Sequence, residues 1–290
     1  MNKQTHCPLC KNELVKTFST KDYLISGETF DIVECLSCTL RITSPFPSVD
    51  TIGNYYNSED YISHSDETKG LFEFIYKFVR FYMLGKKRKL IEKSSGNRPG
   101  KLLDIGCGAG HFLHAMKETG WNVQGVDASE KARKLVSNTF NLDVKSPPDW
   151  LNSDEKYDVI TCWHSLEHIH EPWVYLDNIR THLNPDGVLV VASPNYNSTD
   201  AKRYGPGWAA YDTPRHLYHF TTESMKKIAS SCGFSIQSTH RMNFDSFYVS
   251  ILSAQHIGKS FISGVLNGFI SWLSAMLNRE KCSSLIYIMK

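Results

Sequence analysis

The chain has 290 residues, of which 41% are hydrophobic, 21% charged and 12% aromatic. These fractions exclude a disordered, collagen-like or low-complexity chain. The formal net charge is only +2, so no global basic field argues for a nucleic-acid partner. The N-terminus lacks the apolar core of a secretory signal, and no uncharged apolar run reaches the roughly 20 residues of a membrane span. We therefore expect a cytoplasmic protein with reduced thiols.

Four of the eight cysteines form two pairs near the N-terminus. Cys7 and Cys10 are separated by two residues, and so are Cys35 and Cys38, with 24 residues between the pairs. Two such turns complete a tetrahedral site with no open position, so residues 1–45 are predicted to bind a structural Zn²⁺ around a hairpin. The alternative is four reduced cysteines on two loops without metal.

Residues 46–98 are interpreted as a linker followed by a helix. The linker begins with the Pro- and Ser-rich stretch SPFPSVD, and apolar residues then recur at helical spacing over residues 70–93. The far end of this helix carries the basic run from Lys86 to Lys89. Because cations are favourable at a helix C-terminus, we expect a solvated basic face there.

From residue 101 the pattern becomes an alternation of strands and helices. Strands are predicted at 101–106, 122–127, 142–145, 157–165 and 187–195, with helices at 111–119, 128–140 and 173–183 between them. The last helix before Gly187 is predicted to stop at the turn formed by residues 184–187. A capped helix follows from residue 221 or 222, and two late strands are predicted at 234–241 and 283–290. This alternation indicates an α/β fold with helices on both faces of a doubly wound parallel sheet.

The first strand leads into the glycine-rich turn Asp104-Ile-Gly106-Cys107-Gly108-Ala-Gly110. A dinucleotide turn would read G-x-G-x-x-G, and an acid before it would repel a pyrophosphate. An acid is favourable beside a cationic ligand, and S-adenosylmethionine carries an ammonium and a sulfonium but no phosphate. Asp127 ends the second strand, where a carboxylate can accept both ribose hydroxyls.

At these motifs the chain resembles the class I S-adenosylmethionine-dependent methyltransferases. The matching segments are LDIGCGAGHFL, GVDAS, YDVITCWHSLEHIHEP and LNPDGVLVVASPN, within residues 100–240, together with the terminal strand. The resemblance implies a Rossmann-like seven-stranded sheet whose last strand is antiparallel and inserted, with a core at 99–242 completed by 282–290. It also implies that these residues surround the cofactor: Asp104, Gly106, Cys107, Gly108, Gly110, Asp127, Ala128, Trp163 and His164.

A finer resemblance suggests the substrate class. The paired cysteines, the linker GNYYNSEDY, the sequence LEH and the segment DTPRHLYHFT are similar to those of bacterial sugar and polysaccharide methyltransferases. The zinc-bearing deoxysugar C-methyltransferases carry a further C-terminal domain that is missing here, so we expect O-methylation of a carbohydrate hydroxyl. The alternatives are a quinone-type small aromatic acceptor, RNA, or a non-catalytic methyltransferase-like subunit.

Methyl transfer to a hydroxyl needs a base that takes its proton, and histidine suits that task near neutral pH. Our candidate bases are His168 and His216, with Glu167 orienting a histidine or a substrate hydroxyl. The alternative for each histidine is a structural hydrogen bond. Candidate substrate-binding residues are Asn195, Tyr211, Arg215 and His219.

Residues 243–281 form a predicted helical insertion between the two late strands. Its segment 261–277 carries no charge, with an apolar stripe on one face and small or polar residues on the other. Gly264 and Gly268 permit close helix contact. We expect this helix to pack on the core, on the zinc segment or across a homodimer. The alternatives are a helix that contacts a membrane surface peripherally and a membrane span, for which 17 residues are short.

Overall fold

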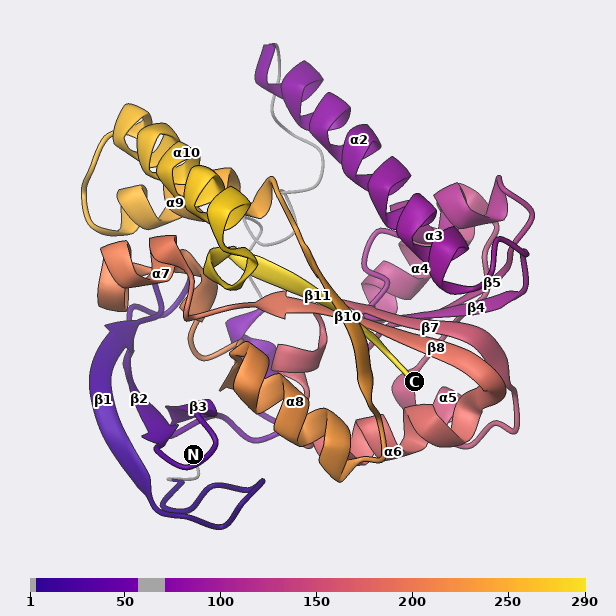
Figure 1. Ribbon diagram of the computed structural model, residues 1–290, viewed down its shortest axis with the longest axis horizontal. Helices are drawn as coiled ribbons and strands as arrows, with labels where there is room; N and C mark the ends of the chain where they lie inside the picture. Colours follow the sequence, from indigo (N-terminus) through magenta and orange to yellow (C-terminus); the bar gives the residue numbers. More distant parts are fainter. Residues whose placement is uncertain (1–3, 57–70) are drawn as a thin grey trace.

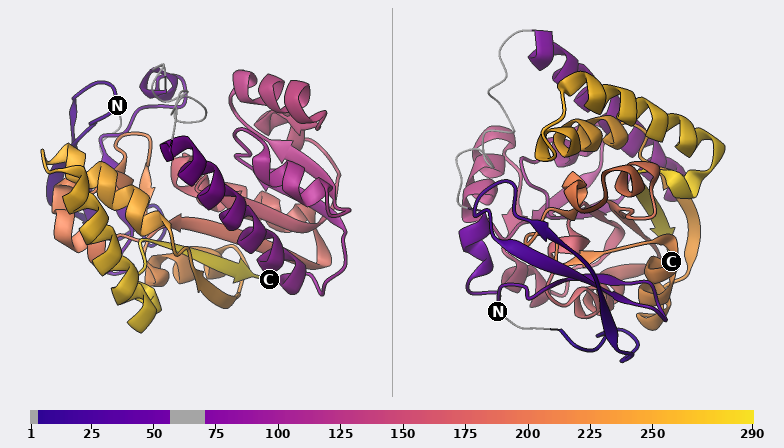
Figure 2. Two further views of the ribbon diagram at one scale, coloured as in Figure 1. Left: turned by 90° about the horizontal axis from the view of Figure 1, so that it is seen from above. Right: turned by 90° about the vertical axis from the view of Figure 1, so that its left-hand side faces the viewer.

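The computed structural model describes residues 4–56 and 71–290, and side chains of helix α2 (Leu71–Ser94) from residue 79 onward. The second half of the linker motif GNYYNSEDY, residues 57–61, lies outside the described residues. The described chain forms a seven-stranded sheet with helices on both faces, a small four-stranded sheet beside it, and a helical hairpin that projects from one side (Figures 1 and 2).

The large sheet has the strand order β10-β11-β8-β7-β4-β5-β6. Its strands are β4 (Lys101–Ile105), β5 (Asn122–Val126), β6 (Val144–Lys145), β7 (Tyr157–Trp163), β8 (Leu183–Pro194), β10 (Ile236–Arg241) and β11 (Ser284–Met289). Strands β4 to β8 are parallel, whereas β11 is antiparallel to both β10 and β8. The predicted Rossmann-like sheet with an inserted antiparallel last strand is therefore confirmed.

Alternate residues of the central strands supply two separate cores. Val159 of β7 packs with α3 (His111–Lys117) and α4 (Glu130–Phe140) on one face of the sheet. Ile160 packs with α5 (Pro147–Leu151), α6 (Pro172–His182) and α8 (Thr222–Ser231) on the other. Successive side chains of a strand point to opposite faces of the sheet, and both faces are covered here. Nearly every residue of these strands is therefore buried, which explains their almost continuous apolar sequence.

The predicted turn at residues 184–187 is wrong. Helix α6 ends at His182 and β8 begins at once at Leu183, which pairs with Tyr157 of β7. A register shift between Tyr157 and Val159 accommodates the extra length, so pairing with β7 overrides the local turn sequence.

The N-terminal segment forms an antiparallel sheet in the order β1-β2-β3-β9. Strands β1 (Leu14–Lys21), β2 (Thr29–Cys35) and β3 (Arg41–Ser44) belong to this segment, but β9 (Tyr218–His219) comes from the chain after β8. The hydroxyl of Thr43 also donates to the backbone oxygen of His216 at 2.7 Å. The sheet thus crosses the domain boundary that we placed at residue 45.

The insertion consists of α9 (Asp245–His256) and α10 (Phe261–Leu277), which run antiparallel. A Cβ atom on Gly264 would lie 2.6 Å from Cα of Ile251, and one on Gly268 would lie 2.8 Å from Cα of Phe247. These glycines therefore permit the close approach of the two helices. No helix among residues 4–56 and 71–290 is long and apolar enough to cross a membrane.

The remaining short helices are α7 (Thr199–Tyr204), η1 (Ile52–Tyr55), η2 (Leu166–His168), η3 (Gly205–Gly207), η4 (Ala209–Tyr211) and η5 (Arg279–Lys281).

Candidate functional site

The glycine-rich turn lies at the carboxyl end of β4, where ligands bind in open α/β sheets. Gly106, Gly108 and Gly110 all have positive φ, at 73°, 52° and 76°. A Cβ on Gly106 would collide with Ser165, whereas one on Gly108 would meet nothing within 4 Å. The turn is therefore packed against the β7 loop on one side and open at Gly108. The side chain of Cys107 lies in the core beneath the turn instead of facing a ligand.

Two carboxylates flank this turn. Asp104 is buried and accepts a hydrogen bond from the Thr161 hydroxyl at 2.6 Å. Burial raises the pKa of Asp104 to about 7. At the end of β5, Asp127 accepts from the amide of Gly108 at 2.9 Å and from the amide of Ser129 at 2.8 Å. Two acids around an open backbone turn favour a positively charged ligand over a pyrophosphate.

Lys87 of α2 also reaches this region, which differs from the solvated face that we expected. Its Nζ lies 4.2 Å from the ring centroid of Trp163 at the end of β7. Burial lowers the pKa of Lys87, while Asp104 and Asp245 oppose that shift. The amphipathic pattern of α2 predicted a helix, but it could not place this one cation between acids from two other elements. The indole N–H of Trp163 is buried and has no hydrogen-bond partner among the described residues.

His164 follows Trp163 with a positive φ of 54° and lies between two acids. Its Nδ1 is 3.4 Å from Oε1 of Glu167, and its Nε2 is 3.1 Å from Oδ2 of Asp245. Burial opposes the charge of His164, but Asp245 and Glu167 outweigh it and raise the pKa to about 10. Asp245 is the first residue of α9, so the insertion contributes directly to the site. Nothing in the sequence indicated this role for Asp245, because the insertion has no recognisable motif.

The structure brings His168 and His216 together beside Glu167. The two imidazole centroids are 4.5 Å apart, and potential ligand atoms of all three residues lie within 4.8 Å of one another. Nδ1 of His216 is 2.9 Å from the backbone oxygen of Ala210, and Nδ1 of His168 is 3.1 Å from that of Arg215. A carbonyl can only accept, so in the neutral form of each ring these contacts place the proton on Nδ1 and leave the lone pair on Nε2.

The electrostatic surroundings keep His168 neutral and Glu167 ionised. Burial and the nearby His216 lower the pKa of His168 to about 4. Burial alone would raise the pKa of Glu167, but His164, His216 and His168 outweigh it and lower that pKa. The result is a buried carboxylate beside a neutral imidazole. A neutral imidazole beside a carboxylate can take a proton from a hydroxyl. Histidine and glutamate side chains are also residue types that can ligate a divalent cation.

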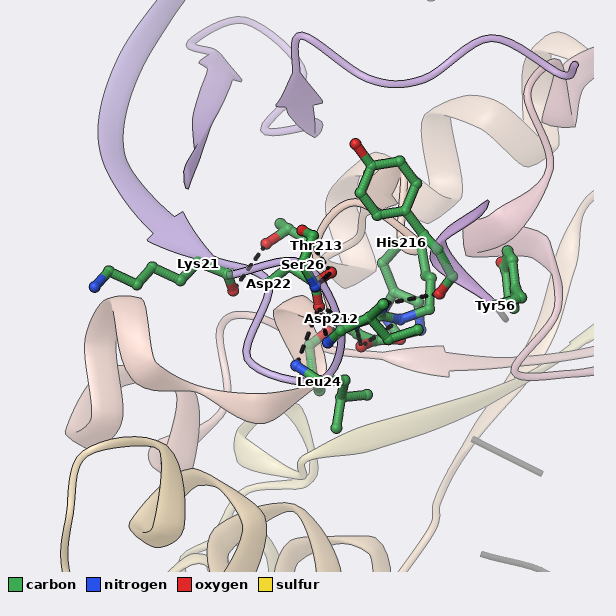
Figure 3. A network of polar contacts seen from close by, with 12 residues as sticks. Lys21, Asp22, Leu24, Ser26, Tyr56, Asp212, Thr213 and His216 are labelled. Atoms are coloured by element: carbon green, nitrogen blue, oxygen red, sulfur yellow. Dashed lines mark hydrogen bonds and ion pairs between the residues drawn. The ribbon is translucent and has the colours of Figure 1, made fainter. Parts of the chain in front are cut away.

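A buried ion-pair network holds the loop that carries His216. Nη2 of Arg215 lies 2.8 Å from Asp22 in the turn between β1 and β2, and 2.7 Å from Asp212. Figure 3 shows this hairpin turn beside Asp212, Thr213 and His216. The hydroxyl of Tyr56 lies 2.9 Å from Nδ1 of His168. The N-terminal segment therefore helps to position both candidate bases.

The predicted substrate-binding residues do not gather at the histidine pair. Arg215 is 1% exposed and is occupied by its ion pairs, and the amide of Asn195 donates to the backbone oxygens of Glu280 and Cys282. His219 contacts the hydroxyl of Thr43 at 3.0 Å. These three side chains are buried and hydrogen-bonded within the protein, so they hold the fold together instead of facing an open cleft.

The fourth predicted substrate residue, Tyr211, lines a cavity of about 750 Å³ between the N-terminal sheet and α8. Its hydroxyl accepts a hydrogen bond from Nη1 of Arg41 at 2.9 Å. The guanidinium of Arg41 in turn lies 4.0 Å from the ring centroid of Tyr196. Tyr211 is thus placed in a cavity that contains neither candidate base nor the glycine turn. Ala128, which the resemblance places around the cofactor, is exposed directly after Asp127 at the carboxyl end of β5.

The four N-terminal cysteines converge, although they come from two turns. Sγ of Cys7 lies 3.5 Å from that of Cys38, and Sγ of Cys10 lies 3.3 Å from that of Cys35. All four thiols are free, and their sulfur atoms lie within 4.8 Å of one another. The hydrogen bond from Cys38 lowers the pKa of Cys7 to about 5, which favours a thiolate. This set of four sulfur donors fits a tetrahedral Zn²⁺ ion and leaves no coordination position open.

The sheet order and the acidic glycine turn define the fold of the class I S-adenosylmethionine-dependent methyltransferases. Solved structures share this fold. Magnesium protoporphyrin IX methyltransferase from Synechocystis PCC 6803, with bound S-adenosylhomocysteine, is 16% identical with a TM-score of 0.55, covering 83% of this chain and 99% of that one. A SAM-dependent methyltransferase from Archaeoglobus fulgidus is 22% identical with a TM-score of 0.51, covering 77% and 100%.

Residues 78–239, more than half of the chain, match the family described as a methyltransferase domain, and the chain belongs to that family. The ubiquinone biosynthesis O-methyltransferase of Actinobacillus pleuropneumoniae serotype 5b is 34% identical over 116 residues, or 36% of this chain and 50% of the relative. That of Histophilus somni is 27% identical over 172 residues, or 49% and 71%. The chain thus spans about half the length of the first of these curated relatives.

Proposed function

We propose that this protein is an S-adenosylmethionine-dependent O-methyltransferase that acts on a hydroxyl of a small molecule. The observation that carries the proposal is the position of the histidine pair. Ser165 packs against the glycine turn at Gly106, and Glu167 and His168 follow within three residues. The proton-accepting groups are therefore connected to the cofactor turn by one short, buried loop.

The residues around the turn fit the cofactor. Asp104 would face its positively charged part, Asp127 would accept hydrogen bonds from the ribose hydroxyls, and the open backbone at Gly108 would allow close approach. When bound, the cofactor supplies a methyl group on a sulfonium, which is already activated for in-line displacement. The protein then has to orient the acceptor oxygen and remove its proton.

His216 is the proposed base, with His168 and Glu167 beside it. The Ala210 carbonyl fixes the His216 ring, so that Nε2 presents a lone pair next to a buried carboxylate. The carboxylate of Glu167 stabilises the imidazolium that forms when His216 takes the proton. His168 stays neutral because of burial, so it does not compete for the same carboxylate as a second cation.

The acceptor that we propose is a phenolic hydroxyl of a quinone-type aromatic. The curated relatives described above are named for O-methylation in ubiquinone biosynthesis, whereas the carbohydrate acceptor rests on the sequence resemblance alone. A phenol with a pKa of about 10 also transfers its proton to an imidazole more readily than an alcohol does. RNA is disfavoured by the balanced charge of 32 basic and 30 acidic residues.

A methyl-transfer screen tests this function. The purified protein is incubated with isotope-labelled cofactor and either dihydroxybenzenes and hydroquinols or nucleotide sugars and glycan fragments, and products are identified by mass spectrometry. We expect a methyl ether of a phenol, which the His216→Gln variant forms about 10²–10⁴-fold more slowly, while its cofactor affinity measured by calorimetry is unchanged. Methylation of sugars alone would overturn the acceptor class. Absence of cofactor binding would overturn the enzyme assignment.

We also propose that the cysteine cluster holds a structural Zn²⁺. The convergent, buried sulfur atoms support it, and the cluster lies at the ends of β2 and β1, away from the histidine pair. The metal would fix a sheet that, through Asp22, positions the loop bearing His216. Elemental analysis should find about one zinc per chain, and replacing Cys35 with Ser should abolish it.

A further inference from the structure

Helix α10 buries the face that an ordinary amphipathic surface helix exposes. Its buried residues are all small: Gly264, Gly268, Ser271 and Ala275. Gly264 and Gly268 face α9, and the hydroxyl of Ser271 donates to the buried carboxylate of Asp200 at 2.8 Å. The face that packs on the protein is therefore the small and polar one. A helix in a globular protein normally buries its apolar stripe.

The apolar stripe of α10 consequently faces outward. Its large side chains are between 41% and 87% exposed: Phe261, Ile262, Leu266, Phe269, Ile270, Leu273, Met276 and Leu277. The 17-residue helix carries no charged side chain. Such a continuous strip is larger than the scattered single apolar residues of ordinary surfaces and marks an interaction site. The α9–α10 hairpin lies at one side of the molecule (Figure 2).

Basic residues surround the two ends of the helix. Lys259 precedes it and is exposed, while Arg279 and Lys281 follow it. Arg203 of α7 donates to the side chain of Asn267 in the middle of α10 at 2.8 Å. The ammonium group of Lys281 lies beside that of Lys202 on α7 and lowers the pKa of Lys202.

The acidic counterparts are few. Asp200 is buried and bonded to Ser271, Asp245 is half-buried and paired with His164, and Glu280 is the one exposed acid in segment 243–281. The whole chain has a nearly balanced charge of +2, so this concentration of cations is local. A close pair of ammonium groups is favourable where an anionic group can bridge them.

We propose that α10 lies in the surface of an anionic phospholipid membrane, with its apolar face among the acyl chains and the flanking Lys and Arg on lipid phosphates. The combination of exposed apolar area and clustered basic side chains supplies the two contributions that stable peripheral binding requires. The helix lies on the membrane and does not span it, in keeping with its length of 17 residues.

A second copy of the chain is the less favourable occupant of this surface. Two α10 helices packed antiparallel about a two-fold axis would bring Lys259 of each copy towards Arg279 and Lys281 of the other. That juxtaposition of like charges opposes the contact, whereas the same cations attract anionic lipid. The exposed strip also offers no side-chain hydrogen-bonding group that would specify a protein partner.

Vesicle flotation tests the proposal independently of catalysis. The full-length protein is mixed with vesicles of phosphatidylcholine alone or with added phosphatidylglycerol. The variant Leu273→Glu places a charge on the outward face, and Leu135→Glu is the matched control, because Leu135 on α4 is 47% exposed and Leu273 is 48% exposed. Cofactor binding and the melting temperature show that each variant is folded.

We expect the wild type and Leu135→Glu to float with anionic vesicles in a salt-sensitive manner, and Leu273→Glu to bind at least about tenfold more weakly. The double variant Lys259→Glu, Arg279→Glu should lose the preference for phosphatidylglycerol. The proposal is overturned if the wild type ignores anionic vesicles, or if both glutamate variants bind equally well. It is also overturned if light scattering finds a dimer that Leu273→Glu dissociates.

Discussion

The two halves of the candidate site are built in different ways. The cofactor half uses the carboxyl ends of β4, β5 and β7, which are neighbours in the sheet and follow one another closely in the chain. The acceptor half is assembled from the β1–β2 turn, the Tyr56 region, the loop after β7 and the loop around His216. Asp22 and Arg215 meet although they are 193 residues apart. The first half is a local property of the sequence, and the second depends on the completed fold.

The largest effect is expected from removing the bases. Replacing His216 with Gln keeps a side chain of similar size but cannot take the proton, and we expect methyl transfer to fall by about 10²–10⁴-fold. The double variant with His168→Gln should fall no more than modestly further if the two act as one unit. Cofactor affinity, measured by calorimetry, should be unchanged. Full activity of the double variant would contradict the base assignment.

The buried ion pair should matter for stability. Arg215→Met leaves the buried carboxylate of Asp22 without its guanidinium partner, and we expect a loss of about 3–5 kcal/mol of unfolding free energy. Urea denaturation measures this change. Adding Asp22→Asn removes the unpaired charge and should restore part of the loss. If the single and double variants are equally unstable, the pair does not connect the two segments as described.

The charged His164 predicts a smaller, pH-dependent effect. Its pKa is raised from 6.5 to about 10 by Asp245 and Glu167 against burial. A raised pKa means that the folded protein holds a proton which the unfolded chain has released. The stabilisation is therefore complete below about pH 6.5 and is lost as the pH rises towards 10.

Unfolding free energies at pH 6, 8 and 10 test this sign. The wild type should lose stability more steeply than His164→Asn across that interval, and the two curves should converge near pH 10. The control variant is His182→Asn, because the His182 ring contacts the backbone oxygens of Asn178 and Ser153 instead of carboxylates. Its curve should not show this difference in pH dependence from the wild type. Parallel curves for the wild type and His164→Asn would contradict the ion pairs.

Sequence reasoning predicted the cofactor half because each element there carries its own local signal. Asp104, the glycines and Asp127 stand at strand ends that hydrophobic pattern alone defines. It brought His168 and His216 forward as histidines after strands, but it could not foresee their contact. It placed Arg215, Asn195 and His219 in the substrate site, because a sequence does not show whether a polar side chain will be satisfied by protein or by ligand.

The insertion teaches the same distinction. The pattern of residues 261–277 predicted a two-faced helix, and the structure has that helix. Which face would be buried depended on α9 and on Asp200, whose carboxylate binds Ser271. The glycines were the available signal, because they permit a close approach that large side chains would prevent. The contribution of Asp245 to the His164 cluster had no comparable signal.

The central claim is that an acidic glycine turn selects a positively charged methyl donor. Its most direct test is the affinity for S-adenosylmethionine relative to S-adenosylhomocysteine, which lacks the sulfonium charge, in the wild type and in Asp104→Asn. Because the pKa of Asp104 is about 7, the wild-type preference for the charged donor should grow from pH 6 to pH 8. In Asp104→Asn the ratio of the two affinities should be about tenfold smaller than in the wild type. The account would be contradicted if Asp104→Asn lowered the affinity for both ligands equally, or if the protein bound a pyridine dinucleotide in their place.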